Sequence, residues 1–258
     1  MPKREVGKAV PMSLPRKWVC DLLHFSKRVP IITAERPLRI RACIEARRKT
    51  PQPPSWSAIL LKAFGLASQR VPEMRRSYLG APWGRLHEMP YSVGSLVIDR
   101  EYQGEHAVFC CPLLYPERMS LDEIHTKTDR WKKEPVEDHG PLRRIVKLTK
   151  LPLPIRRFAW WFGMNVSGYW KARYYGTFAI NSLAGMRGSI MQMCFPCTCF
   201  LYYGIPDKDG TMPVQFGFDH RVFDGFAASR ALGELEGILN HEIVEELQAL
   251  PRAVKLAA

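Results

Sequence analysis

The sequence lacks a hydrophobic run long enough to cross a membrane. Its longest weakly polar stretch, from Ile190 to Ile205, contains Gln192 and Pro196 and falls short of the roughly 20 apolar residues that a spanning helix requires. The N-terminus is charged and has no apolar block after its charges, so it does not resemble a secretory signal. Internal repeats and low-complexity segments are also missing, which argues against a repeat protein or a disordered chain.

Acidic residues are few. The 258 residues include 25 Asp and Glu against 38 Lys and Arg, which gives a formal net charge of +13. This excess would attract nucleic acid, a membrane surface or a phosphorylated ligand such as coenzyme A. Because the basic residues form no recognisable nucleic-acid motif, we do not expect nucleic-acid binding. Seven cysteines, an odd number, leave a thiol unpaired and favour a reducing, cytoplasmic setting.

The composition, with 46% hydrophobic and 24% charged residues, is that of a globular protein and fits one domain over residues 1–258. Ser120 and Glu123 form a capping box at the start of one predicted helix. The hydrophobic patterns predict further helices over 16–25, 55–69 and 225–239, and strands over 91–99, 106–114, 176–183, 200–204 and 213–219. A mixed α/β fold follows.

The segment from about 142 to 175 interleaves basic and aromatic residues. It contains Arg143, Arg144, Lys147, Lys150, Arg156, Arg157, Lys171 and Arg173, together with Phe158, Trp160, Trp161, Phe162, Tyr169, Trp170, Tyr174 and Tyr175. One interpretation is a helix that packs its rings into the core and leaves its arginines in water. The other is a docking surface for an acyl chain, an acyl carrier protein or a membrane, since these residue types suit a boundary between polar and apolar media.

The stretch from 213 to 239 is the most informative chemically. Apolar residues alternate along a predicted strand, His220 follows the end of that strand, and Asp224 opens a helix whose N–H groups it can cap. A histidine fixed between two rigid elements suits a general base. The same pair also fits a plain strand end and helix cap with no catalytic role.

The motif DHRVFDG over residues 219–225 resembles the active-site signature His-x-x-x-Asp-Gly of the catalytic domain of dihydrolipoyl acyltransferases and of the related chloramphenicol acetyltransferases. GTFAINSLAG over 176–185 is similar to the GTFTISNLG strand of that family, and VPMSLPRK over 10–17 to the start of its catalytic domain. The similarity covers about residues 10–239 and is faint between 134 and 175. It implies an α/β (α+β type) fold, a mixed sheet flanked by helices, in a homotrimer with each active site at a subunit boundary.

The resemblance also implies roles for single residues. His220 would remove the proton from a thiol or hydroxyl nucleophile that attacks a thioester carbonyl. Asp224 would hold the local geometry through an ion pair with an arginine near the N-terminus such as Arg16.

The oxyanion position departs from the family pattern. The family's hydroxyl residue aligns with Asn181, whose side-chain amide can donate a hydrogen bond to an oxyanion. Strand alternation places Thr177 and Asn181 on one face and Ser182 on the other. A register slip that exposes Ser182 is therefore an alternative.

We expect an acyltransferase that moves an acyl group from a CoA-type thioester to a thiol, hydroxyl or amine acceptor. Coenzyme A or acyl-CoA would be a co-substrate, and no cofactor would be bound permanently. Only nine residues precede the matching region, so a free-standing enzyme is favoured over one with lipoyl and subunit-binding domains. Because Asn181 replaces the hydroxyl residue, a second hypothesis is an inert scaffold that forms a trimer or a larger cage. The single C-x-x-C from Cys194 to Cys197 lacks a second ligand pair, so no metal site is predicted.

Overall fold

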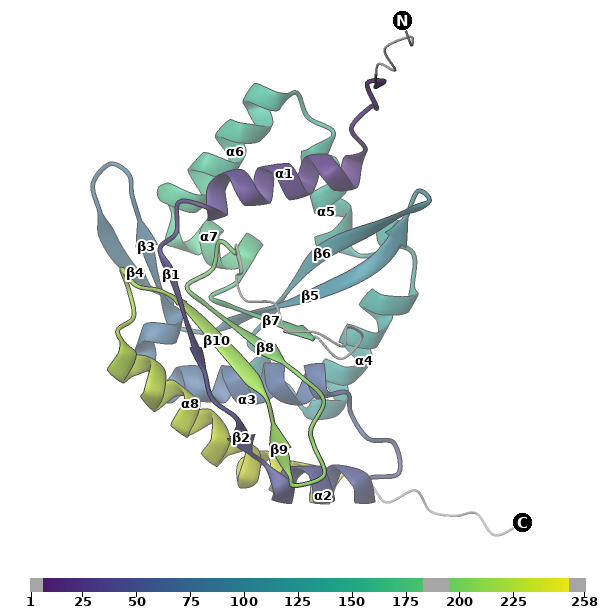
Figure 1. Ribbon diagram of the computed structural model, residues 1–258, viewed down its shortest axis with the longest axis vertical. Helices are drawn as coiled ribbons and strands as arrows, with labels where there is room; N and C mark the ends of the chain where they lie inside the picture. Colours follow the sequence, from purple (N-terminus) through teal and green to yellow (C-terminus); the bar gives the residue numbers. More distant parts are fainter. Residues whose placement is uncertain (1–6, 183–194, 251–258) are drawn as a thin grey trace, which may run out of the picture.

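The computed structural model describes residues 7–182 and 195–250 and has a six-stranded mixed sheet at its centre (Figure 1). The strand order is β1-β10-β8-β7-β5-β6. These strands are β1 Ile31–Glu35, β5 Val93–Tyr102, β6 Glu105–Leu114, β7 Phe178–Ser182, β8 Cys199–Tyr203 and β10 Val214–Asp219. β7 runs parallel to β5 and β8, whereas the other neighbouring pairs are antiparallel. The predicted mixed sheet is confirmed.

Helices cover both faces of this sheet (Figure 1). One face carries α2 Arg41–Lys49, α3 Trp56–Arg70, α4 Leu121–Lys133, α8 Gly225–Asn240 and α9 Glu242–Ala249. The other carries α1 Leu14–Ser26, α5 Gly140–Thr149, α6 Leu153–Asn165 and α7 Gly168–Tyr175. Short strands pair as β2 Leu38–Arg39 with β9 Thr211–Met212, and as β3 Arg76–Leu79 with β4 Arg85–Glu88; single turns η1 Pro72–Arg75, η2 Pro116–Arg118 and η3 Val136–Asp138 complete the order.

Two apolar clusters, one on each face of the sheet, form the core. Phe178 and Ile180 of β7 belong to the cluster under α3 and α8, whereas Ala179 between them belongs to the cluster with Trp18 of α1 and Trp160 of α6. β7 therefore alternates its side chains between two buried layers. This alternation is the one predicted from the sequence, and it fixes the face on which each following residue lies.

The predicted capping box at the start of α4 is confirmed. Ser120 caps α4, since its Oγ accepts from the Glu123 N–H at 3.2 Å while its own N–H donates to Glu123 Oε2 at 2.7 Å. Gln103 and Gly104 both have positive φ in the tight turn between β5 and β6, as a two-residue hairpin turn requires. The basic and aromatic segment folds as three helices. None of the helices within the described ranges combines the length and apolar character that crossing a membrane needs.

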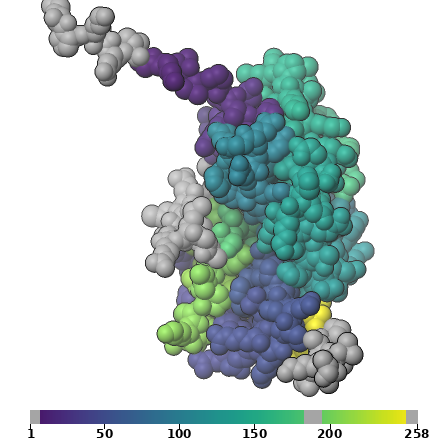
Figure 2. Space-filling view, turned by 90° about the vertical axis from the view of Figure 1, so that its right-hand side faces the viewer, coloured from purple at the N-terminus to yellow at the C-terminus, as the bar shows by residue number. Residues whose placement is uncertain are grey.

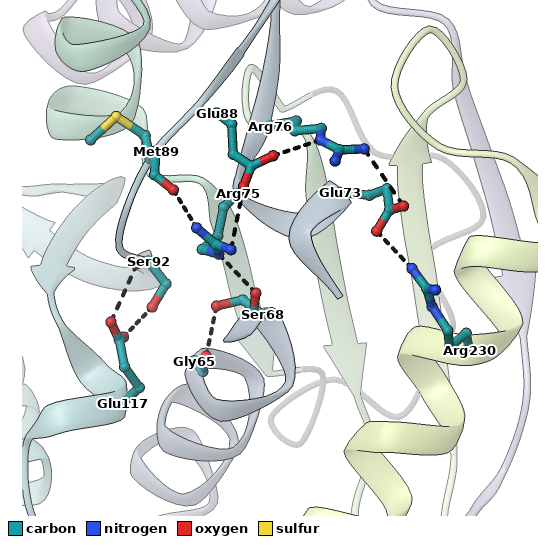
Figure 3. Close-up of polar contacts among 10 residues, drawn as sticks. All are labelled: Gly65, Ser68, Glu73, Arg75, Arg76, Glu88, Met89, Ser92, Glu117 and Arg230. Atoms are coloured by element: carbon teal, nitrogen blue, oxygen red, sulfur yellow. Dashed lines mark hydrogen bonds and ion pairs between the residues drawn. The ribbon is translucent and has the colours of Figure 1, made fainter. Parts of the chain in front are cut away.

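A polar network anchors α8 and the β3–β4 hairpin to the helix layer (Figure 3). Arg75 is 9% exposed and donates to the carbonyl oxygens of Ser68 at 2.9 Å and Met89 at 2.5 Å. Glu73 of η1 accepts from Arg230 of α8 at 2.8 Å. These contacts satisfy a buried guanidinium, as its burial demands, and they hold the helix that follows the DHRVFDG motif.

Candidate functional site

His220 lies in a tight turn between β10 and α8. The Asp219 carbonyl accepts from the N–H groups of Val222 at 2.9 Å and Phe223 at 3.0 Å, and the His220 N–H donates to Pro30, just before β1, at 3.0 Å. His220 Nδ1 is 2.8 Å from the Phe223 carbonyl oxygen. Because a carbonyl only accepts, Nδ1 carries the proton and Nε2 is left as the acceptor. The exposed ring therefore has the tautomer of a base that acts through Nε2.

Asp224 is the N-cap of α8. Its Oδ1 accepts from the Ala227 N–H at 2.7 Å, which satisfies one of the free donors at the helix start. Arg16, by contrast, is exposed on α1 and lies 4.0 Å from Glu105 at the tip of the β5–β6 hairpin. The expected ion pair between Arg16 and Asp224 is therefore not formed within the described part of the chain. Asp224 is held instead by its hydrogen bond to the Ala227 N–H at the start of α8.

The first residues of the motif belong to a partly buried charge cluster that was not predicted from the sequence. Asp219 is 1% exposed and binds Arg221 through both carboxylate oxygens, at 2.8 and 2.7 Å. The Arg221 guanidinium lies over the Tyr78 ring at 4.2 Å, a cation–π contact. Lys171 of α7 donates to the Tyr78 carbonyl at 2.9 Å. Asp219 and Arg221 are part of the DHRVFDG motif and could have been singled out from the sequence. The residues they contact, Tyr78 and Lys171, lie on distant elements, so the cluster itself could not.

The pKa of Lys171 reflects this cluster. It is lowered to about 8, chiefly by burial; the carboxylate of Asp219 opposes this lowering and the guanidinium of Arg221 adds to it. A lysine that is 2% exposed loses most of its hydration, which disfavours the charged form. The amine of Lys171 is thus a titratable group close to Asp219 and Arg221, the residues on either side of His220.

Asn181, Ser182 and Thr177 occupy three different environments on and next to β7. Asn181 lies on the face of Ala179, is partly exposed and pairs in register with Tyr202 of β8. Ser182 lies on the opposite face, where it hydrogen-bonds the Tyr203 hydroxyl. Thr177 is fully buried, and its hydroxyl both accepts from the Val93 N–H at 3.0 Å and donates to the Val93 carbonyl at 3.2 Å. Among these three, Asn181 has the side-chain amide on the partly exposed side.

The strand register places Asn181 and His220 at opposite ends of the sheet. Asn181 is level with Tyr202, which is level with Gln215, and His220 follows Gln215 by five positions. At about 3.3 Å per residue and about 4.8 Å per strand, the two residues are separated by about 17 Å along the strands and about 10 Å across them. One chain therefore brings His220 and Asp224 together but keeps Asn181 apart from them.

One apolar cavity among the described residues lies away from both His220 and Asn181. It measures about 190 Å³ and lies between α1, α5, α7 and β6, where Trp18, Cys110, Arg144, Ile145 and Tyr174 line it. Neither His220 nor Asn181 is among its lining residues. His220 is exposed and Asn181 is partly exposed in the single chain.

Of the cysteines in the C-x-x-C segment, Cys194 lies outside the described residues. Cys197 and Cys199 are both buried, and burial raises the pKa of both thiols. Protonated thiols are poor metal ligands and nucleophiles. Within residues 7–182 and 195–250, no three His, Cys, Asp or Glu side chains gather in a way that could hold a metal ion.

Comparison with solved structures identifies related folds. A probable dihydrolipoamide acetyltransferase from Listeria monocytogenes has 17% identity and a TM-score of 0.62, with 96% of this chain and 98% of that chain covered. A dihydrolipoamide acetyltransferase from Azotobacter vinelandii, determined to investigate the roles of a serine, a histidine and an asparagine in catalysis, has 19% identity and a TM-score of 0.64, with 93% and 94% covered. The cubic core of the pyruvate dehydrogenase multienzyme complex has 19% identity and a TM-score of 0.63, also with 93% and 94% covered.

The sequence matches no protein-family model and no curated protein. The structural comparison nevertheless shows that the chain shares its fold with acetyltransferase catalytic cores along nearly the whole length of both compared chains. The fold class expected from the motif is confirmed. At such low identity the likeness is one of fold.

Proposed function

We propose that the protein is an acyltransferase whose site forms between two copies of the chain. It would transfer an acyl group from a CoA-type thioester to a thiol, hydroxyl or amine acceptor. His220 would take the proton of the nucleophile, and Asn181 of a neighbouring copy would donate a hydrogen bond to the oxyanion. The separation of these two residues within one chain carries the proposal, because both sides of the reaction require groups within hydrogen-bond reach of the same carbonyl.

The environment of His220 supports the role of base. Its Nδ1–H is held by the Phe223 carbonyl, so Nε2 is free to accept a proton. The Azotobacter structure was used to investigate the role of a histidine and of an asparagine four positions after it, which is the spacing of His220 and Asp224. In this chain the carboxylate of Asp224 fixes the turn through its helix cap. Asp224 is therefore a positioning residue in this proposal.

The position of His220 next to a free sheet edge supports the subunit boundary. β1 is an outermost strand of the sheet, and Ile32 on it is 46% exposed. The unpaired backbone groups of an edge strand are a template for another chain. A homotrimer is the smallest ring that would give every copy the same neighbour on each side, and one solved neighbour is the cubic core of a multienzyme complex. The +13 charge suits the phosphates of coenzyme A.

The first experiment measures acyl transfer from acetyl-CoA and longer acyl-CoAs, with dihydrolipoamide as the first acceptor. His220→Ala and Asn181→Ala should each lower kcat about 100-fold or more, the magnitude found for removal of one oxyanion donor or one general base. Asn181→Ser, which restores the hydroxyl of the family pattern, should retain activity. Ser182→Ala is the matched control and should leave turnover close to wild type, because its hydroxyl faces Tyr203.

Mixed oligomers test the subunit boundary. The two inactive variants are co-expressed with different tags, and particles containing both are purified. In a ring of three that contains both variants, one boundary in three carries an intact His220 and an intact Asn181, so about one third of wild-type turnover should return. Mixed particles as inactive as the parents would refute the composite site.

The replacement of the expected hydroxyl residue by Asn181 favours one alternative, a scaffold that keeps the fold and the assembly without catalysis. Binding separates the two. At a concentration about 100 times its dissociation constant, coenzyme A should stabilise the enzyme by roughly 2.7 kcal/mol. A well-formed oligomer that neither gains thermal stability with any acyl-CoA nor transfers an acyl group would support the scaffold.

A further inference from the structure

The outward face of α6 is apolar along its whole length. Its exposed large side chains are Leu153, Ile155, Phe158, Trp161 and Phe162, and we call these five residues the α6 face. Phe158 is 63% and Ile155 is 55% exposed. Leu151 just before the helix adds to the same apolar surface. A surface helix ordinarily directs its polar residues outward. In α6 the large apolar residues point outward instead.

The cause of this orientation is a buried ion pair. Both arginines of α6, Arg156 and Arg157, point inward to the carboxylate of Asp21 on α1, which is fully buried. Arg156 is 7% exposed and also donates to the Thr149 carbonyl at 3.2 Å. The charges of α6 are thus bound within the protein, and the aromatic residues of the same helix are left outside.

The surroundings of the α6 face are basic. Arg143, Arg144, Lys147 and Lys150 are the exposed charged residues of α5 and the turn after it. From His139 to Pro206 the sequence contains no Asp or Glu at all. In the space-filling view, the teal segments that include α5 to α7 form a continuous band along one side of the molecule (Figure 2). An apolar face that follows directly on a helix with exposed cations combines the two features that bind anionic lipid.

We propose that the α6 face docks the protein on an anionic phospholipid surface, with Phe158, Trp161 and Phe162 in the headgroup region and the α5 cations against the phosphates. Charge decides between this partner and a second copy of the chain. Two copies that met through α5 and the α6 face would bring cations against cations, and residues 139–206 supply no carboxylate to compensate them. The headgroup region accepts the aromatic side chains, whereas the lipid phosphates neutralise the lysines and arginines.

Vesicle flotation tests the proposal with the whole protein. Wild type should float with vesicles of phosphatidylcholine that contain phosphatidylglycerol, remain unbound with pure phosphatidylcholine, and be released by salt. Phe158→Ser combined with Trp161→Ser should lower the partition coefficient at least ten-fold. Arg143→Glu combined with Lys147→Glu should also lower it at least ten-fold, since each cation near an anionic surface contributes about a five-fold factor.

Phe226→Ser is the matched control, because Phe226 is 79% exposed on α8. Its partition should equal that of wild type. Circular dichroism and the Tm of each variant establish that it is folded. The proposal is overturned if wild type does not bind the anionic vesicles, or if the charge-reversal variant binds them as well as wild type does. Loss of oligomers in the Phe158→Ser, Trp161→Ser variant, measured by light scattering, would instead identify the face as a contact between copies.

Discussion

Asp21→Asn is the perturbation that best tests how the helix layer is held together. Asp21 is 0% exposed, and it faces Arg157 Nε at 2.9 Å and the side chain of Arg156. Removing one partner of a buried ion pair typically costs 3–5 kcal/mol, because the other charge is left without compensation. Asparagine keeps the shape of the side chain, so the experiment isolates the charge.

The structure favours the lower end of that range. Arg156 keeps its hydrogen bonds to the carbonyls of Thr149 and Leu151, and Arg157, whose side chain is 29% exposed, can turn toward water. The carboxylate oxygens of Asp21 lie within ion-pair distance of both guanidinium groups, and this attraction is what the substitution removes. We therefore expect a loss of about 3 kcal/mol in the free energy of unfolding.

Urea unfolding and thermal scans measure this loss. For a chain of this size, about 3 kcal/mol corresponds to a Tm lowered by about 6–12 °C. Asp99→Asn is the control, because Asp99 is exposed and faces His106 at 3.4 Å on the surface, where an ion pair contributes little. A value for Asp21→Asn within about 1 kcal/mol of wild type would show that the buried pair does not hold α6 to α1.

Two further predictions concern β10 and the cluster behind it. Because burial lowers the pKa of Lys171 to about 8 from its ordinary 10.5, the unfolded chain binds more protons between these values, and the free energy of unfolding should rise with pH across this window. Urea titrations should find a smaller rise in Lys171→Met, and equal slopes would contradict the assignment. Gly217→Ala would place its Cβ 1.9 Å from the Phe200 ring and should cost about 2–3 kcal/mol. Gly233→Ala, in open space on α8, should be neutral or stabilising by about 0.4–1 kcal/mol.

The elements around the motif could be predicted from the sequence because their signals are local. Val214, Phe216 and Phe218 alternate and are all buried on one face of β10, and Asp224 caps the next helix as its residue type predicts. β1 and the β3–β4 hairpin were not predicted. Their strands mix polar and apolar residues, and β1 is defined by pairing with β10 nearly 200 positions away.

The candidate site was predictable in its residue types but not in its geometry. The motif identified His220 and Asp224, yet the distance from Asn181 depends on the directions of three strands, which no local pattern encodes. The Arg16 ion pair failed for the same reason, since Glu105 reaches α1 only through the hairpin. The first interpretation of residues 142–175 placed arginines in water and rings in the core. Asp21 reverses that order for α6, although Trp160 does pack inside.

Among the described residues, the edge of β1 and the α6 face are exposed, and the chemistry of each suits a different proposed partner. The edge of β1 beside His220 offers backbone N–H and C=O groups, which a protein strand or loop can satisfy and hydrocarbon cannot. The backbone of α6 is satisfied by its own hydrogen bonds, and its outward side chains are apolar, so lipid can cover it without loss. Substitutions on the α6 face should therefore weaken lipid binding and leave assembly intact. A proline at Thr33, whose N–H points away from β10 because residues 30 and 36 make the hydrogen bonds to that strand, should disrupt assembly and leave lipid binding of the folded chain intact.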